Sequence, residues 1–375
     1  ESIADEVLEA ISEQYHFPLP QNQNLRSLLK DFFYLKLYLK LDPAGLDLVS
    51  SEELFLQQVW KEVICDSHRR AENLPVRREE MVTHIVFSML QRGSTIYISS
   101  ANDDYMARTA REDIGIIAVY DNSPRRWMMS HDVYEELIIK HILTQRYQEG
   151  IEAEKVLEGF GLSLRARKLY RIWLESVFAS GGGRYADFLI SMLQSGLDQA
   201  WKDETLIALM QSDQVDCFRA IDPILSQERY SLFTRMVFLL NTACRDIDRE
   251  LLKKLSTPTG NKYRFTCPVG RAWFTVFQYI YNNRGLIPWT AQNLDIVTNT
   301  LKTWTAKYET GETTGLAGRI ALDLKSEIWK RERYTYTLRR ASRFITLTDL
   351  ILAAAMELNQ ELTDIFQSFT DTQTD

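Results

Sequence analysis

The chain has 375 residues, of which 45% are hydrophobic and 25% are charged, and its formal net charge is -7. That length and hydrophobic content allow more than one buried core, so we expect two or three domains. The acidic balance argues against a surface that binds nucleic acid or anionic membranes over its whole extent.

Patterns typical of membrane and secreted proteins are missing from the sequence. No apolar run approaches the roughly 20 residues that a membrane-spanning helix needs, and the N-terminal stretch ESIADEVLEAI has no signal-peptide pattern. The four cysteines, Cys65, Cys217, Cys244 and Cys267, have no paired spacing. We therefore expect a cytoplasmic protein with reduced thiols and no membrane partner. The chain begins with Glu rather than Met, which suggests a piece of a longer protein.

Residues 1–46 are expected to form a small helical segment. An amphipathic helix is followed by the polar break HFPLPQNQN and then by LRSLLKDFFYLKLYLKL, in which apolar residues recur every three or four positions. The stretch LDPAGLDLVS at 41–50 is typical of a linker into a second domain.

Residues 47–147 have the pattern of a winged-helix domain. The helix SSEELFLQQVWKEVI is predicted to have a serine cap and an acidic first turn, and the next, PVRREEMVTHIVFSMLQR, opens with proline. A third short helix, ANDDYMARTAREDIG, precedes the apolar runs IGIIAVY and RWMMS, which the turn DNSP joins into a predicted β-hairpin. The helix DVYEELIIKHILTQRY closes the domain.

Residues 148–375 predict a series of helices, each of roughly a dozen to twenty residues. They are separated at GFGLS, SGGGR, STPTGNK, NNRGLIP and ETGETTG. Their similar size and apolar stripes favour a HEAT-like helical repeat array, although no fixed period can be counted. The expected fold is therefore mainly α, with a winged-helix domain that contains a small β-hairpin, followed by a helical array that offers an extended surface to partners.

The motifs of common catalytic and metal sites are missing. The sequence contains no GxxxxGK[ST], GxGxxG, HExxH, CxxC or GxSxG. Cys65 and His68 are a helical turn apart, but no second pair of ligands accompanies them. We expect neither a catalytic residue nor a metal site in this chain.

His131 lies between the predicted hairpin and the helix at 132–147. Asp132 and Glu135 have capping-box spacing, which predicts Asp132 as the N-cap and leaves His131 just outside the positive end of the helix. A phosphate placed there would meet unpaired amide donors, and the imidazole would add one more hydrogen bond. Two interpretations stay open: His131 contacts an anionic ligand, or it makes a structural hydrogen bond that ties strand to helix.

The element order and two short motifs resemble a known family. A short helical lid, a winged helix that ends in Met-x-His-Asp and a helical array together resemble the regulatory portion of STAND NTPases, the superfamily of NACHT and NB-ARC proteins, and most of all its bacterial antiviral members. The segment 129–132, MSHD, corresponds to the family's MHD-like motif with one extra residue. FFYLKLYL at 32–39 is similar to the lid that follows the ATPase core, with Phe32 where the family usually has proline.

The resemblance implies a nucleotide switch. His131 would reach the β-phosphate of ADP and hold the inactive state, Asp132 would support its loop, and ATP with Mg would replace ADP on activation. The family's P-loop and Walker B residues precede the lid, so the chain would depend on an upstream ATPase module and would not hydrolyse ATP alone. The helical array would bind a trigger, in the antiviral members a phage protein. Activation would bring self-association and switch on an effector.

Two other functions remain open. The first is a winged-helix DNA-binding regulator with a helical ligand-sensing domain, whose third helix would enter the major groove. That helix carries Asp103, Asp104, Glu112 and Asp113 against Arg108 and Arg111, which argues against nucleic acid, although Arg125 and Arg126 at the wing tip favour it. The second is a passive helical scaffold for protein–protein interaction, in which His131 is only structural.

Overall fold

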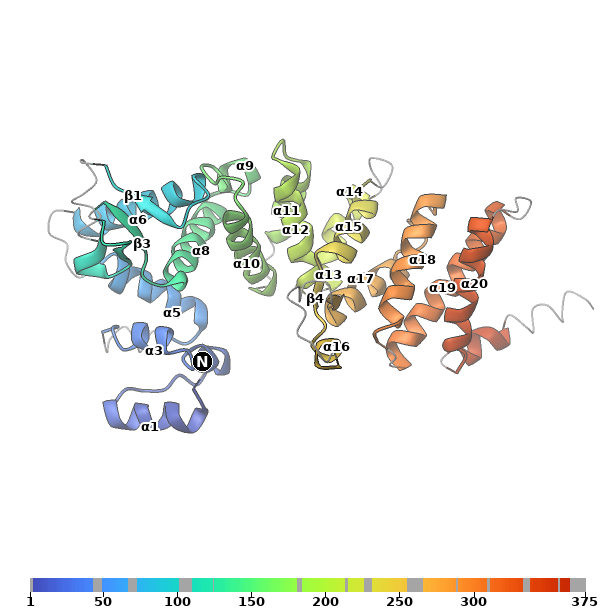
Figure 1. Ribbon diagram of the computed structural model, residues 1–375, viewed down its shortest axis with the longest axis horizontal. Helices are drawn as coiled ribbons and strands as arrows, with labels where there is room; N and C mark the ends of the chain where they lie inside the picture. The colour runs from blue at the N-terminus through green and yellow to red at the C-terminus, as the bar shows by residue number, and fades with distance from the viewer. Residues whose placement is uncertain are drawn as a thin grey trace, which may run out of the picture. The chain divides into compact units, whose positions relative to one another are not determined.

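A computed structural model describes most of the chain (Figure 1). The described residues are 3–42, 49–66, 73–100, 110–123, 125–180, 184–212, 215–225, 231–254, 266–287, 289–308, 311–332, 338–356 and 358–364. They form two compact units, one within residues 1–151 and 155–173 and the other within 152–154 and 174–375. Helices predominate in both, and the described residues include two small antiparallel sheets. The mainly α fold is therefore confirmed, while the finer division at residues 46 and 147 stays a prediction.

The first unit combines short helices with a three-stranded sheet. Its elements in chain order are α1 (Asp5–Tyr15), α2 (Gln23–Leu28), α3 (Phe32–Tyr38), α5 (Glu52–Val59), the π-helical turn η1 (Trp60–Ile64), α6 (Leu74–Gln91), β1 (Ile96–Ile98), the π-helical turn η3 (Ala110–Ile114), β2 (Ile117–Val119), β3 (Arg126–Met129) and α8 (Asp132–Glu149). Two further helices, α9 (Ala153–Val156) and α10 (Leu164–Ser180), belong partly to each unit.

The predicted helix LRSLLKDFFYLKLYLKL is interrupted at Asp31. The Asp31 carboxylate accepts a hydrogen bond from the backbone N–H of Phe33 (2.8 Å), so this residue caps the start of α3 instead of continuing α2. An aspartate inside a helix competes for nearby amides, and the apolar period alone does not reveal that competition. The predicted serine cap of the next helix is confirmed, because the Ser51 hydroxyl accepts from Leu54 N–H (3.2 Å).

The predicted β-hairpin is present and belongs to a larger sheet. Strand β2 pairs antiparallel with β3, and the turn residues Asp121 and Asn122 both have φ of 52°. Aspartate and asparagine adopt that left-handed conformation more readily than other non-glycine residues. Strand β1, which the sequence did not predict, pairs with the other edge of β3. A strand of three residues is too short for alternation of apolar and polar side chains to identify it.

The sheet order β1-β3-β2, followed by α8, is compatible with a winged helix. The predicted third helix falls on residues 101–115, of which 101–109 lie outside the described residues. The charged positions at 103, 104 and 108 that bear on DNA binding are among these. The winged-helix assignment therefore stays a prediction.

The second unit is a succession of helices. Its remaining elements are α11 (Tyr185–Gln194), α12 (Gln199–Gln211), α13 (Val215–Phe218), the 3-10 turn η4 (Arg219–Ile221), α14 (Asp222–Leu225), α15 (Ser231–Thr242), β4 (Arg245–Ile247), α16 (Arg249–Lys254), β5 (Thr266–Pro268), α17 (Gly270–Asn282), α18 (Ala291–Thr305), α19 (Gly311–Glu332) and α20 (Leu338–Ala353). Packing joins helices that are near in sequence: α12 contacts α15 and α17, α15 contacts α18, and α19 contacts α17, α18 and α20.

Large aromatic side chains fill the interior of this unit. Trp273 and Phe277 of α17 and Trp304 of α18 are buried, and the rings of Phe277 and Trp304 stack with their centroids 4.7 Å apart. Aromatic rings of this size dominate the apolar area that a helical core removes from water. Packing between successive helices is what a helical array requires, and the HEAT-like repeat itself stays a prediction.

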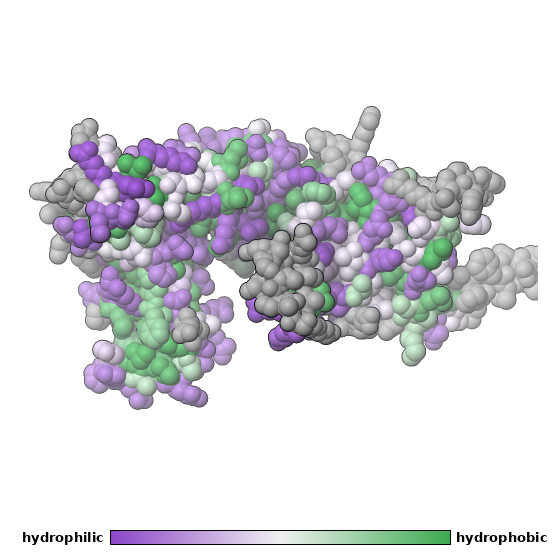
Figure 2. All heavy atoms as spheres, viewed as in Figure 1, coloured by the Kyte–Doolittle hydropathy of each residue, from purple (hydrophilic) through white to green (hydrophobic). Residues whose placement is uncertain are grey.

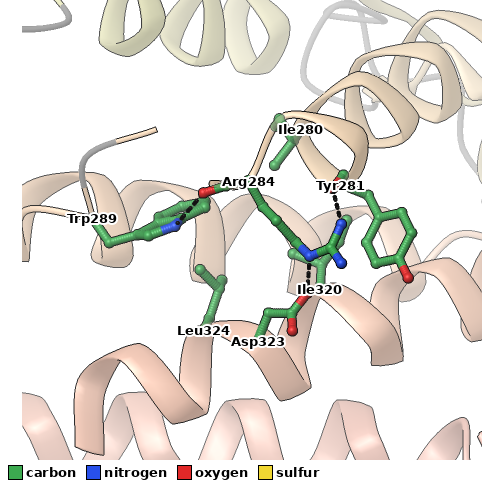
Figure 3. Close-up of a pocket in the computed structure, with 7 residues that line it drawn as sticks. All are labelled: Ile280, Tyr281, Arg284, Trp289, Ile320, Asp323 and Leu324. Atoms are coloured by element: carbon green, nitrogen blue, oxygen red, sulfur yellow. Dashed lines mark hydrogen bonds and ion pairs between the residues drawn. The ribbon is translucent and has the colours of Figure 1, made fainter. Parts of the chain in front are cut away.

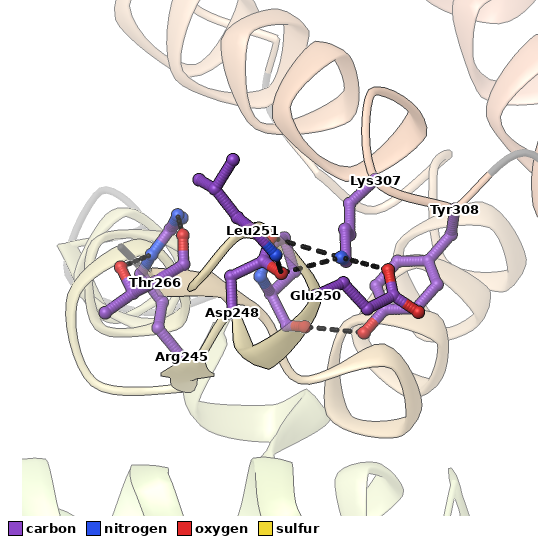
Figure 4. Close-up of polar contacts among 8 residues, drawn as sticks. Arg245, Asp248, Glu250, Leu251, Thr266, Lys307 and Tyr308 are labelled. Carbon is purple, nitrogen blue, oxygen red and sulfur yellow. Dashed lines mark hydrogen bonds and ion pairs between the residues drawn. The ribbon is translucent and has the colours of Figure 1, made fainter. Parts of the chain in front are cut away.

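A segment made of β4, α16 and β5 interrupts the helical succession, and the sequence did not predict its strands. Figure 4 shows how polar contacts hold it to the residues just after α18. Lys307 Nζ lies 3.1 Å from carboxylate oxygens of both Asp248 and Glu250, and the Tyr308 hydroxyl donates to the carbonyl of Pro268 (2.7 Å). Two neighbouring residues therefore contact the segment at two places, the start of α16 and the end of β5.

Arg284 joins the end of α17 to α19 (Figure 3). Its Nε lies 2.7 Å from a carboxylate oxygen of Asp323, and its guanidinium lies 4.3 Å from the centre of the Tyr281 ring. Its carbonyl accepts a hydrogen bond from the indole N–H of Trp289 (3.0 Å). The pair of Arg284 and Asp323 neutralises the charges that line this small hollow. We therefore interpret the hollow as a packing contact between helices.

Close contact between α19 and α20 depends on Gly318. A Cβ atom added there would overlap the Cβ of Ala354 and lie 2.9 Å from Cδ1 of Leu358. Gly318→Ala should destabilise the second unit by about 1–3 kcal/mol, because overpacking outweighs the roughly 1 kcal/mol that alanine gains over glycine in a helix. Chemical denaturation followed by circular dichroism measures the change. Gly285→Ala is the matched control, since its added Cβ meets nothing within 4 Å; equal midpoints for the two variants would contradict the prediction.

Candidate functional site

His131 caps the N-terminus of α8. Its backbone is extended (φ -155, ψ 141), and its imidazole Nδ1 accepts a hydrogen bond from Val133 N–H (3.3 Å). The sheet positions His131 at the start of the helix. Ser130 N–H donates to the carbonyl of Ile116 (2.8 Å), which continues the β2–β3 pairing one residue past β3. Only His131 is then left between the end of the sheet and the first residue of the helix.

The prediction that Asp132 is the N-cap is wrong. Asp132 is the first residue of α8, and its side chain is 98% exposed. The capping box also fails, because Glu135 is buried and its carboxylate contacts Arg165 instead of the backbone before the helix. The helix begins one residue earlier than predicted, and the histidine before it acts as the cap by accepting from the amide of Val133, the second helical residue.

A side chain of α3 covers one face of the His131 ring. The rings of Phe33 and His131 stack with centroids 4.0 Å apart and planes 16° from parallel, while Tyr134 meets Phe33 edge-on at 4.9 Å. Asp31 positions Phe33 in the first turn of α3 through its cap. Residues about a hundred positions apart in sequence thus lie together, and the apolar run around Phe33 gave no sign of this contact.

The cap also determines which nitrogen of His131 can donate. Since Nδ1 accepts from an amide, the proton of a neutral imidazole is on Nε2. Nε2 is thus a hydrogen-bond donor at the positive end of a helix of 18 residues. A donor in this position is suited to an anionic oxygen, such as that of a phosphate.

Charged side chains beside the cap limit what it can bind. Arg165 contacts Glu135 closely and lies 3.8 Å from Asp132. Burial raises the pKa of Glu135, and the neighbouring Arg165 opposes that rise. When all three are ionised, two carboxylates face one guanidinium, so the cluster has no spare positive charge for a phosphate. The residues fit one hydrogen bond to a nucleotide, and most of the binding energy for a nucleotide must come from other groups.

A second cluster lies further along α8. The His141 ring stacks on Trp60 with centroids 3.8 Å apart, and its Nε2 lies 3.7 Å from Glu79. Burial lowers the pKa of His141 to about 4 and raises the pKa of the Cys65 thiol to about 12. A histidine with so low a pKa is a weak base, and a thiol with so high a pKa is a poor nucleophile at neutral pH. His68 lies outside the described residues, and no group of three metal-binding side chains occurs among those that are described.

Comparisons with known proteins leave the family open. No protein-family model matches the sequence, and no protein of curated function matches it. In the part of the chain that the structure describes, no helix combines the length and apolar character needed to cross a bilayer. The nucleotide roles of His131 and Asp132 accordingly stay predictions.

The stack between Phe33 and His131 should hold α3 against α8. Phe33→Ala removes the ring from both His131 and Tyr134, so α3 should open more often, by about 1–2 kcal/mol for a half-buried aromatic residue. Hydrogen exchange measured by mass spectrometry should show amides of α3 exchanging about tenfold faster. Phe32→Ala is the control, because that neighbouring ring is 58% exposed; equal exchange in the two variants would show that the stack contributes nothing.

Acid should destabilise the first unit through His141. Its folded pKa of about 4 lies below the ordinary value of 6.5, so the unfolded chain takes up the proton first as the pH falls. Stability should decrease between about pH 6.5 and pH 4, and His141→Phe should reduce that decrease while keeping a ring against Trp60. Glu79 acts in the opposite sense, because burial raises its pKa. Denaturation midpoints across this range test the idea, and parallel curves for wild type and variant refute it.

Proposed function

We propose that this chain is the regulatory part of a nucleotide-switched STAND NTPase with an antiviral role. In this proposal residues 1–46 are a helical lid, 47–147 a winged helix and 148–375 a helical sensor. The observation that supports it best is the stack of Phe33 on His131, because it joins the lid-like segment to the MSHD motif. In a nucleotide switch the lid and the MSHD motif have to be coupled, so that they stay together in one state and separate in the other.

The proposed role of His131 is to hold the closed, ADP-bound state. Nε2 donates a hydrogen bond to the β-phosphate while Nδ1 remains on the amide of Val133 and Phe33 covers the ring. Asp132, exposed and 3.8 Å from Arg165, supports the loop that holds His131 at the nucleotide. Release of ADP removes the hydrogen bond at Nε2, so the closed state then depends on the contacts between α3 and α8 alone. ATP with Mg then binds the open state.

An upstream ATPase module is part of the proposal, and the surface of the first unit offers room for it. Large apolar side chains are exposed on its N-terminal helices: Val7, Phe32, Leu39 and Leu54. Figure 2 shows hydrophobic surface gathered over α1 and α3. Grouped apolar side chains of this kind mark a surface that another domain or protein covers. Phe32 is also the first residue of α3, the helical position that proline favours.

The second unit would act as the sensor. Its helices pack mainly on near neighbours, an arrangement that leaves a long surface for a protein ligand such as a phage protein. A trigger that binds the open state more tightly than the closed one shifts the equilibrium by the difference between the two affinities. Self-association and effector activation follow from the open state.

The test compares His131→Ala with His84→Ala in the protein extended upstream of Glu1. Loss of a hydrogen bond to a charged phosphate costs about 1.5–3 kcal/mol, so bound ADP should leave the His131 variant roughly 10–100-fold faster. His84 is an exposed histidine of the same unit and serves as the control. Fluorescent ADP displaced by excess unlabelled ADP reports the rate.

Two results would overturn the proposal. One is ADP release from the His131 variant at the wild-type rate. The other is an upstream gene sequence without a GxxxxGK[ST] loop in the ~150–200 residues that one ATPase domain occupies. A salt-dependent shift of duplex DNA by the chain alone would instead favour the DNA-binding regulator.

A further inference from the structure

Helix α20 has apolar side chains on two opposite faces. Its inner face, which packs on α18 and α19, buries Leu347, Leu350 and Ile351. On the outer face Ile345 is 63% exposed and Leu352 is 67% exposed, and Met356, just beyond the helix, is 89% exposed. Green spheres lie at the α19–α20 end of the chain on the face shown in Figure 2.

The outer residues follow the spacing of a helix-pairing seam. The exposed positions 342, 345, 349, 352 and 356 are separated by three, four, three and four residues. This 3.5-residue period is that of the a and d positions through which two helices pack side by side. Within the helix, from Ser342 to Leu352, the seam extends for about 15 Å at 1.5 Å per residue, and Met356 lies in the turn that follows. Ser342 and the exposed Ala353 are small, which lets a second backbone approach closely.

A helix with apolar side chains on two opposite faces is normally covered on both. Beyond α20 the chain continues on α19, since residues 359–364 are helical and Glu361 lies 2.9 Å from Arg319. Among the described residues, this continuation leaves Ile345 and Leu352 of the outer face exposed. A further helix lying along the seam would remove Ile345, Leu352 and Met356 from water together.

The charge at the middle of the seam selects the partner. Asp349 is exposed and occupies the central position, between Ile345 and Leu352. A second copy of α20 packed about a two-fold axis would bring two Asp349 carboxylates together at the centre, and like charges in that position oppose association. A helix with Lys or Arg at the matching position would neutralise the carboxylate within an otherwise apolar contact.

We propose that the outer face of α20 binds an amphipathic helix whose apolar seam carries a basic residue opposite Asp349. The inference does not depend on the nucleotide switch, since it rests only on side chains of α20 and just beyond it, none of which has a role in the proposed function. Binding buries the three exposed apolar side chains, and the basic residue determines register and specificity.

The probes are two synthetic helical peptides of four turns with leucine at the seam positions, one with lysine and one with glutamate at the centre. The lysine peptide should bind the chain at least about tenfold more tightly than the glutamate peptide, measured by fluorescence anisotropy. Asp349→Lys should reverse that preference. Leu352→Glu should abolish binding of both peptides, while Leu286→Glu, which changes an equally exposed leucine elsewhere in the unit, should not.

Three outcomes would overturn the inference. Equal affinity for both peptides would show that Asp349 does not select the partner, and unchanged binding by the Leu352 variant would place the peptide elsewhere. Dimerisation of the chain in sedimentation experiments, abolished by Leu352→Glu, would assign the seam to a second copy. Because the substituted side chains are exposed, the variants are expected to fold, and circular dichroism verifies this.

Discussion

The arrangement of the first unit depends on how abruptly strand β3 passes into α8. The sheet continues through Ser130, and the helix begins at Asp132, so a single residue has to end one pattern of hydrogen bonds and start the other. An extended backbone at His131 allows this, and its imidazole takes the amide that would otherwise lack a partner. The ring is consequently held in one orientation, which is why Phe33 can stack on it. The position of α3 follows from a requirement of the helix terminus.

The same geometry explains why one histidine could work as a switch without being a strong binding site. A group that bound nucleotide tightly by itself would hold one state and resist exchange. Here Glu135 and Asp132 offset the charge of Arg165, so in the proposed switch His131 would add a single hydrogen bond to the other contacts of a nucleotide. A contribution of about 1–3 kcal/mol is the size of typical coupling energies between sites. In the proposed switch, loss of this hydrogen bond would change the balance of the two states without abolishing nucleotide binding.

Sequence patterns predicted the features that depend on neighbouring residues and missed those that depend on distant ones. The β2–β3 hairpin and the serine cap are local, and both are confirmed. Strand β1 exists because β3 pairs with it across about thirty residues, and three residues leave no visible period. The N-cap was misplaced by one residue because Glu135, the expected partner in the capping box, is held by Arg165, thirty residues away. No local pattern contains that information.

Helix α20 shows the same distinction between its two faces. The inner face is specified by a close fit, since Gly318 of α19 leaves no room for a side chain where Ala354 approaches. The outer face has the same apolar character but no such fit, because Ile345 and Leu352 contact solvent. Periodicity makes the two stripes look equivalent, although the inner stripe is buried against other helices and the outer stripe is exposed. Asp349, at the middle of the outer stripe, distinguishes the two faces further. A carboxylate in contact with solvent needs no partner, but one buried within an apolar seam requires a cation.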